Sequence, residues 1–183
     1  MIAKLYLVRH GQDSGSGDED ADPGLNDLGH GQAAAMAAAM APLGPLPIMV
    51  SPLRRTRETA QPLEAAWGVS GVVEPAVREI PSPGEDLSNR REWLTAIMSG
   101  TWAQVDALLH PWRQGVIDTL LALRQDSVIV SHFVAINVAV GAAQGDDRVR
   151  IFRPNNCSIT VLESNGENLR LIELGEASET KVG

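Results

Sequence analysis

Three short apolar runs, without regular polar alternation, divide the first two thirds of the chain. They read "KLYLV", "IMV" and "SVIV" and occupy residues 4–8, 48–50 and 127–130. A strand is apolar along its whole length when both faces of its sheet are covered, as in parallel sheets flanked by helices. The pattern therefore predicts three buried, parallel strands.

A helical pattern follows each of these runs. Residues 30–41 are rich in alanine, which favours a helix, and a group of prolines ends the segment. Ser51 and Pro52 are typical of the N-cap and first turn of a helix, which we predict to continue to about Trp67. Residues 133–143 are almost wholly apolar and predict a buried helix.

Apolar residues recur at intervals of three and four between residues 87 and 123, which predicts helix throughout this region. Pro111 should divide it by starting a second helix. Trp102 and Trp112 belong to the apolar stripe, and we interpret them as core residues rather than a ligand platform.

The end of the sequence predicts a β-hairpin, formed by residues 157–163 and 169–174 around a Ser-Asn-Gly turn. We expect residues 175–183 to be a loosely held tail. Strands that alternate with helices indicate the α/β class. The expected architecture is a three-layer α/β/α sandwich with a mostly parallel central sheet and helices on both faces, built as one domain over residues 1–183.

Composition limits the classes of function. Hydrophobic residues make up 44% and charged residues 21%, and the formal net charge is −8. This charge disfavours binding to nucleic acid or an anionic membrane, so any anion site must be a local concentration of positive charge. Cys157 is the single cysteine, which we expect to be buried and inert. No segment resembles a membrane span or a signal peptide, so we expect a cytoplasmic protein.

The predicted strands deliver charged residues to one place. Ligands bind beyond the carboxyl ends of the strands in open α/β sheets. The three runs end in "RHG", "SPLRRTRETA" and "SH", so the same edge should receive a basic group consisting of Arg9, His10, Arg54, Arg55 and His132. Because a guanidinium matches phosphate oxygens with a planar set of donors, we predict a phosphate ligand. The histidines and the lone cysteine lack metal-ligand spacing, so we expect no metal.

These segments carry a resemblance. In order, "LVRHG", "SPLRRTRETA", "VREI" and "VSHF" resemble the signatures of the histidine phosphatase superfamily, the phosphoglycerate mutase-like family. Two further segments, "LNDLGHGQA" and "NNCSITVLE", are similar to the family's sequence around its first helix and a late strand. The match extends over nearly the whole chain. It implies phosphoryl transfer through a phosphohistidine without a metal or other cofactor.

The resemblance also implies roles. His10 would be the nucleophile, and Arg9 and Arg55 would hold the phosphoryl oxygens. His132 would donate a hydrogen bond to the same oxygens as a cation. Glu79 would protonate the leaving oxygen and then deprotonate the attacking water.

Some of these assignments have alternatives or additions. Glu85 is a nearby rival to Glu79 as the acid. The phosphate-binding set further includes Gly11 and Gln12, which follow the nucleophile. Arg90 and Arg91 could contact a second anionic group or be surface charge, and Arg153 is a similar candidate.

Three activities remain open besides the one we predict, which is hydrolysis of a small phosphorylated substrate. Mutases of the family continue after R-H-G with a Trp-Asn pair, whereas this chain reads "QDSGSGDED", which favours a phosphatase. The alternatives are mutase-type transfer, a phosphohistidine-protein phosphatase and a non-catalytic phosphate-binding module. The acidic residues after Gln12 should repel highly anionic substrates. They are Asp13, Asp18, Glu19, Asp20 and Asp22.

Overall fold

The computed structural model describes residues 1–15, 20–82, 84 and 89–177. Its strands are β1 (Ala3–Arg9), β2 (Ile48–Val50), β3 (Val72–Val73), β4 (Ser127–Ser131), β5 (Ile159–Ser164) and β6 (Leu169–Glu173). Its α-helices are α1 (Asp27–Met40), α2 (Arg54–Trp67), α3 (Arg90–Met98), α4 (His110–Ala122) and α5 (Phe133–Gln144). Short 3₁₀ turns occupy Ala41–Leu43, Pro75–Val77, Trp102–Gln104 and Ala107–Leu109.

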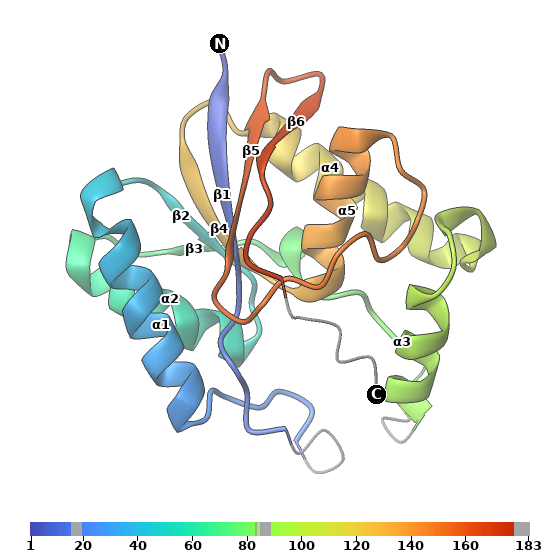
Figure 1. Ribbon diagram of the computed structural model, residues 1–183, viewed down its shortest axis with the longest axis horizontal. Coiled ribbons are helices and arrows are strands. Elements are labelled where there is room, and N and C mark those ends of the chain that lie inside the picture. The colour runs from blue at the N-terminus through green and yellow to red at the C-terminus, as the bar shows by residue number, and fades with distance from the viewer. Residues whose placement is uncertain (16–19, 83, 85–88, 178–183) are drawn as a thin grey trace.

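The strands form one six-stranded sheet in the order β3-β2-β4-β1-β5-β6. The first four are mutually parallel, and β5 and β6 are antiparallel to their neighbours. Helices α1 and α2 cover one face, and α4 and α5 cover the other (Figure 1). The predicted three-layer sandwich with a mostly parallel sheet is confirmed.

Alternate side chains of the central strands enter two separate hydrophobic cores. Leu5 and Leu7 of β1 pack in the core beneath α4 and α5, whereas Val8 packs with α1 and α2. The same alternation separates Ile129 of β4 from Val130. Because side chains of a strand point to opposite faces in turn, a fully apolar strand can bury both sets.

The region between residues 87 and 123 differs from its prediction. Residues 87 and 88 lie outside the described residues, and residues 99–109 between α3 and α4 are not α-helical. Here the backbone pairs with a distant loop, since the Trp102 N–H donates to the Asp147 carbonyl and the Val149 N–H to that of Gly100. Trp102 is buried as predicted, but Leu108 is exposed. The spacing of apolar residues gives no information about such a long-range pairing.

Smaller differences concern where elements begin. Helix α2 starts at Arg54 with Leu53 as its N-cap, whereas the prediction had Ser51 as the N-cap and Pro52 as the first helical residue. The prediction missed β3, a two-residue edge strand that is too short to produce a pattern. Pro111 lies in the first turn of α4, as predicted. The hairpin of β5 and β6 is confirmed.

The tail after the hairpin is partly held. The Gly175 N–H donates to Thr160 Oγ1, and Ala177 forms an isolated bridge with Pro154. The remaining residues of the expected loose tail, 178–183, lie outside the described residues. In the described part of the chain, no helix has the length and apolar character needed to cross a membrane.

The parallel strands end at one level, which positions the site. Arg9, the last residue of β1, pairs with Ser131, the last residue of β4. The ladder then continues past the strands, because the His10 N–H donates to the Ser131 carbonyl and the Ser51 N–H to that of Val130. His10, Ser51 and His132 therefore leave the sheet side by side.

Two glycines of α1 provide a test of how tightly this edge is packed. A Cβ on Gly29 would lie 2.0 Å from the Gln12 carbonyl oxygen, whereas a Cβ on Gly31 would meet no atom within 4 Å. We expect Gly29→Ala to lower the free energy of unfolding by about 1–3 kcal/mol through overpacking. Gly31→Ala should raise it by about 0.5–1 kcal/mol, because alanine is the better helix former. Urea unfolding of both variants would measure this, and equal shifts would contradict the close packing.

Candidate active site

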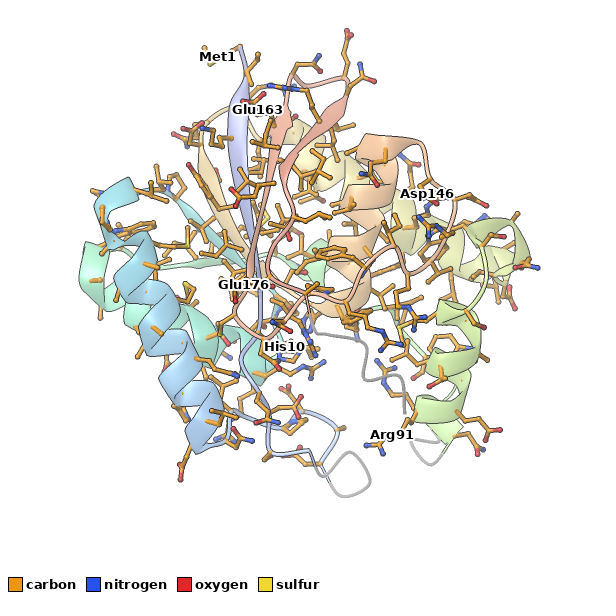
Figure 2. All side chains as sticks on the ribbon, viewed as in Figure 1. Met1, His10, Arg91, Asp146, Glu163 and Glu176 are labelled. Carbon is orange, nitrogen blue, oxygen red and sulfur yellow. The ribbon has the colours of Figure 1, made fainter. Side chains whose placement is uncertain are left out.

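The two predicted histidines meet at the carboxyl edge of the sheet. The ring centroids of His10 and His132 are 5.3 Å apart, and both side chains are buried. His10 directly follows β1, and His132 lies between β4 and α5. Figure 2 shows His10 beyond the end of β1 that lies opposite Met1.

The contacts of His10 define its tautomer. Nδ1 lies 2.7 Å from the Gly11 carbonyl oxygen, which can only accept a hydrogen bond, so Nδ1 carries the proton. Nε2 lies 3.3 Å from Arg55 Nε, which can only donate, so Nε2 presents its lone pair. The imidazole is thus neutral, and Nε2 carries the lone pair that a nucleophile needs, here accepting a hydrogen bond from Arg55 Nε.

The surroundings of His10 keep it neutral. Burial, together with the nearby positive charges of Arg55 and Arg9, lowers the pKa of His10 to about 3. A cationic imidazole would lose hydration and be repelled by two guanidiniums. His10 therefore remains unprotonated throughout the neutral pH range.

Two contacts hold the guanidinium of Arg9 in place. Its Nη1 donates to the Pro154 carbonyl at 2.8 Å, and its Cζ lies 5.3 Å from the centroid of the Phe133 ring. Its Nε is buried without a hydrogen-bond partner in the described part of the chain. Burial lowers the pKa of Arg9, partly offset by Glu79 and Asp13, but a guanidinium remains charged.

Arg55 comes from the first turn of α2 and is also largely buried. Besides its contact with His10, its Nε lies 3.9 Å from Asp13 Oδ2. This carboxylate stands beside the group that we expect to hold a phosphoryl oxygen. Asp13 thus competes with an anionic ligand for Arg55.

Glu79 contacts the first turn of α5. Its carboxyl oxygens accept the N–H groups of Val134, at 3.1 and 3.2 Å, and of Ala135, at 3.3 Å. The Ile80 N–H also donates to Oε1, at 3.0 Å. Burial raises the pKa of Glu79, and these donors offset only part of that effect. The raised pKa extends the pH range in which Glu79 holds a proton, which is the direction that a general acid requires.

His132 is fixed by a residue that the sequence analysis did not assign to the site. Its Nε2 lies 2.7 Å from Ser51 Oγ, while its Nδ1 is buried without a hydrogen-bond partner among the described residues. Burial lowers the pKa of His132, and the neighbouring His10 and arginines add to this. In the absence of an anion, the neutral form is therefore favoured, not the predicted cation.

Two further residues tie the loop after β1 to the rest of the site. Thr59 Oγ1 accepts the Gly11 N–H at 2.9 Å and donates to the Arg55 carbonyl at 2.7 Å. Asn156 Nδ2 donates to the His10 carbonyl at 2.9 Å. Thr59 follows Arg55 by one helical turn, a spacing that could have identified it. Asn156 is 146 positions from His10, and no local pattern indicates that contact.

Gly11 and Gln12 do not extend their donors into the cavity. The Gly11 N–H is used by Thr59, and the Gln12 N–H donates to Gln32 Oε1 at 2.9 Å. Gln12 is exposed. Gly11 instead allows a close approach, because a Cβ there would lie 2.7 Å from the Gly29 carbonyl oxygen. Their predicted contact with phosphate has no support in this geometry.

The other predicted residues fall into three groups. Arg54 is exposed and pairs with Glu58, as expected for a surface helix face. Burial raises the pKa of Cys157 to about 12, which agrees with an inert thiol. Glu85, the rival acid, lies outside the described residues, as do Asp18 and Glu19.

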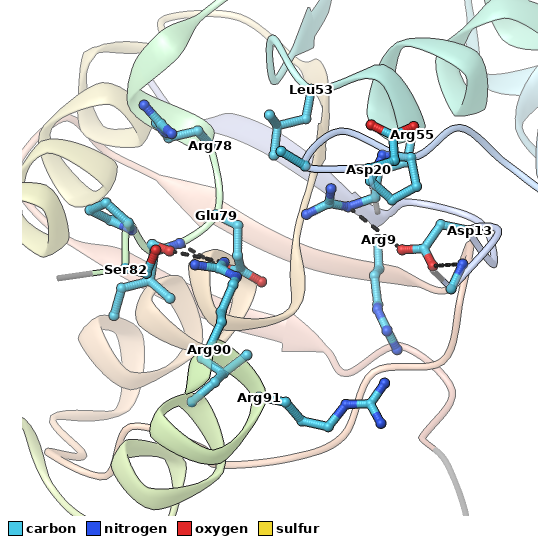
Figure 3. Close-up of a pocket in the computed structure, with 16 residues that line it drawn as sticks. Arg9, Asp13, Asp20, Leu53, Arg55, Arg78, Glu79, Ser82, Arg90 and Arg91 are labelled. Carbon is cyan, nitrogen blue, oxygen red and sulfur yellow. Dashed lines mark hydrogen bonds and ion pairs between the residues drawn. The ribbon is translucent and has the colours of Figure 1, made fainter. Parts of the chain in front are cut away.

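A cavity of about 830 Å³ is lined by Arg9, Arg55 and Glu79, whereas the buried His10 and His132 are not among its described lining residues. Figure 3 shows arginines on opposite sides of it, with Glu79 between them. Among the described residues, its charged lining consists of Arg9, Arg55, Arg78, Arg90, Arg91, Asp13, Asp20 and Glu79. The site thus combines a neutral imidazole, a carboxyl group with a raised pKa and, among the described lining residues, an excess of fixed positive charge.

Comparison with known proteins agrees with this arrangement. The sequence profile of the histidine phosphatase superfamily (branch 1) matches residues 5–177. The chain belongs to this superfamily. Probable phosphoglycerate mutase GpmB of Erwinia tasmaniensis is 30% identical in an alignment 181 positions long that covers 87% of this chain and 84% of that protein. GpmB of Escherichia fergusonii is 29% identical, with the same coverage.

Solved structures share the histidine phosphatase fold. A mycobacterial glucosyl-3-phosphoglycerate phosphatase has a TM-score of 0.72 at 22% identity and covers 96% of this chain and 100% of its own. A phosphoserine phosphatase of Entamoeba histolytica, in complex with 3-phosphoglyceric acid, has a TM-score of 0.75 at 21% identity and covers 96% and 98%. At these identities the likeness concerns the fold.

The position of Asp13 leads to a prediction about phosphate affinity. Asp13→Asn removes a carboxylate beside Arg55, so we expect inorganic phosphate to bind about 3–10-fold more tightly. Isothermal titration with phosphate at low salt would measure this. Asp27→Asn is the matched control, because Asp27 is exposed and does not line the cavity. Equal gains in both variants would indicate a general effect of net charge and contradict the specific role of Asp13.

Proposed function

We propose that this protein hydrolyses a small phosphomonoester through a phosphohistidine formed on His10. The observation that supports this most directly is the state of the imidazole. Gly11 accepts from Nδ1 and Arg55 approaches Nε2, so the lone pair of Nε2 lies beside a guanidinium suited to a phosphoryl oxygen. A histidine held for structural reasons alone would not require a buried cation at its basic nitrogen.

The first step transfers the phosphoryl group from the substrate to the enzyme. His10 Nε2 attacks phosphorus in line with the ester oxygen, a new N–P bond forms, and the P–O bond to the alcohol breaks. Protonated Glu79 gives its proton to the leaving oxygen, so the alcohol departs neutral. Arg9 and Arg55 balance the charge of the phosphoryl oxygens, as fixed donors do in phosphoryl transfer.

The second step releases phosphate. Glu79, now a carboxylate, takes a proton from a water molecule, whose oxygen attacks phosphorus as the N–P bond breaks. The electron pair of that bond returns to His10 Nε2, and Glu79 regains its proton. The enzyme is then in its starting state, with one water consumed.

His132 contributes a donor to both steps in this proposal. If the Ser51 hydroxyl donates to Nε2, then Nδ1 carries the proton, and Nδ1 is the ring nitrogen that lacks a partner in the described part of the chain. A bound phosphoryl dianion also raises the pKa of His132, because it adds negative charge close to the ring. Substrate binding would thus favour the cation that the empty site disfavours.

Hydrolysis is preferred to mutase-type transfer for two reasons. The segment after R-H-G lacks the Trp-Asn pair that the resemblance associates with mutases. In addition, the similar solved structures include enzymes described as phosphatases. Mutase activity is the second candidate, because curated relatives carry the name phosphoglycerate mutase. A carboxyl group with a raised pKa at Glu79 favours an oxygen ester over a phosphohistidine protein, since an imidazole leaves without such an acid.

A comparison of two reactions tests this proposal. Purified protein is incubated separately with 3-phosphoglycerate and phenyl phosphate, and both phosphate release and isomerisation are measured. We expect phosphate release from at least one ester to exceed isomerisation. His10→Ala should reduce release by at least about 1000-fold, since the nucleophile is lost. Isomerisation faster than release would establish the mutase alternative, and full activity of His10→Ala would exclude catalysis by this residue.

The role of Glu79 has its own test, which depends on the leaving group. Glu79→Gln retains a hydrogen-bond acceptor for the α5 N–H groups but cannot supply a proton. We expect kcat for an alkyl phosphate to fall by about 100–10,000-fold. The loss should be smaller for 4-nitrophenyl phosphate, whose leaving group departs without protonation. In the wild type, activity on the alkyl ester should decline as pH rises through the raised pKa of Glu79.

Equal losses for the two esters would contradict the assignment of Glu79 as the acid. Such a result would show that Glu79 acts only by holding α5. Circular dichroism of Glu79→Gln separates this from a general loss of fold, because a misfolded variant loses its helical signal.

A further inference from the structure

The segment that leads into β5 contacts both residues at the end of β1. Its carbonyl at Pro154 accepts a hydrogen bond from Arg9 Nη1 at 2.8 Å, and Asn156 Nδ2 donates to the His10 carbonyl at 2.9 Å. In addition, the Cys157 N–H donates to the Arg9 carbonyl at 2.9 Å. Three residues of this segment therefore hold two residues that the proposed mechanism requires.

The backbone of this segment has an unusual conformation. Residues 155–158 form a turn, closed by a hydrogen bond from the Ser158 N–H to the Asn155 carbonyl. Within the turn Cys157 has a φ of 57°, and among the described residues it is the only residue other than glycine with a positive φ. A Cβ makes this left-handed region unfavourable, so neighbouring contacts must maintain the conformation. As in a β-bulge, two residues then face Arg9, whose carbonyl accepts from Cys157 and whose N–H donates to the Ser158 carbonyl.

The Asn156 side chain in this turn contacts one particular peptide group. The carbonyl of His10 and the N–H of Gly11 belong to the same planar unit. Asn156 donates to the carbonyl, and Thr59 Oγ1 accepts the N–H at 2.9 Å. The plane of this peptide is thus fixed from both sides, by residues that are far apart in the sequence.

The orientation of that peptide determines where the next carbonyl lies. The Gly11 carbonyl accepts a hydrogen bond from His10 Nδ1 at 2.7 Å, and this contact leaves the lone pair on Nε2. Because glycine has a flexible backbone, rotation of the His10–Gly11 peptide would move this acceptor away from Nδ1. The proton would then be free to occupy Nε2, which would lose the lone pair that a nucleophile needs.

We propose that Asn156 is a positioning residue for the nucleophile, which holds the His10–Gly11 peptide so that His10 keeps its proton on Nδ1 and its lone pair on Nε2. This inference rests on the proposed phosphatase function and adds to it a residue that acts through the backbone. Asn156 is not among the described residues that line the cavity, so we expect it to act without contacting the substrate.

The tautomer of His10 is a readout that does not depend on turnover. Protein labelled with ¹⁵N-histidine gives ring-nitrogen signals for the four histidines, and His10→Gln identifies those of His10. Asn156→Ala should lower the ratio of the Nδ1–H to the Nε2–H tautomer by about 3–10-fold, the value of one neutral hydrogen bond. The signals of His110, whose ring contacts the Trp102 carbonyl, should not change. An unchanged ratio for His10 would overturn the proposal.

Kinetics separate positioning from substrate binding. Asn156→Ala should lower kcat for phenyl phosphate by about 10–100-fold, because a poorly oriented nucleophile slows the transfer. The Kd for inorganic phosphate should change by less than about twofold, since Arg9 and Arg55 are retained. Asn168→Ala is the matched control, because Asn168 is an exposed asparagine between β5 and β6, and its kcat should equal that of the wild type. A loss of phosphate affinity as large as the loss of kcat would show that the turn acts on Arg9, and would overturn the assignment.

A second substitution carries the test if Asn156→Ala does not fold, as judged by circular dichroism. Asn156→Ser retains a residue that is common in turns, but its shorter side chain does not reach the His10 carbonyl. It should reproduce the change in tautomer and the loss of kcat. Wild-type values of both in Asn156→Ser would overturn the proposal.

The same measurements separate failure of this inference from failure of the proposed function. An unchanged tautomer in Asn156→Ala, together with phosphate release that depends on His10, would overturn the role of Asn156 alone. A changed tautomer with wild-type kcat would also overturn it, since the state of the imidazole would then not limit the reaction. Absence of release by the wild type, together with a changed tautomer in Asn156→Ala, would overturn the phosphatase function but support the hold of Asn156 on His10.

Discussion

The placement of two buried guanidiniums against one neutral imidazole is the constraint on which the rest of the site depends. Arg9 and Arg55 lower the pKa of His10 and cannot themselves lose their charge. The only carboxylate that pairs with either guanidinium among the described residues is Asp13, at 3.9 Å from Arg55. The protein therefore holds positive charge in a confined place although its formal net charge is −8. A dianionic phosphoryl group would neutralise this positive charge more completely than any carboxylate of the described residues does.

The two guanidiniums stay close together only if the backbone holds their residues in fixed positions. The ladder of β1, β4 and β2 fixes the level at which His10 and His132 leave the sheet. Thr59 then joins the loop after β1 to α2, so the nucleophile and Arg55 share one rigid unit. These ties require small residues at close contacts, as at Gly11 and Gly29. The energy that keeps the charges together comes from the two hydrophobic cores on either side of the sheet.

The sequence predicted the strands that carry the site because those strands are apolar along their length and each is followed by a distinct motif. Site residues that are neighbours in the sequence were likewise predictable, as with Arg9 and His10 at the end of β1. The features that could not be predicted from the sequence depend on contacts between distant segments. Serine is a typical N-cap residue, yet the hydroxyl of Ser51 contacts His132, 81 positions away. The break between α3 and α4 arises in the same way, since a loop near Asp147 competes with the helix for the backbone of residues 100–102.

Burial affects the two principal titratable groups of the site in opposite directions. It lowers the pKa of His10, which would be cationic when protonated, and raises the pKa of Glu79, which would be anionic when deprotonated. One physical cause thus disfavours the charged form of both groups, which keeps the imidazole unprotonated and shifts the carboxyl group toward its protonated form. Reversing either state would require exposure to water, which would also weaken the hold of the arginines on an anion. The low exposure of this edge therefore strengthens the binding of an anion and also sets the pKa values that the proposed reaction needs. An anionic substrate supplies the negative charge that the arginines lack.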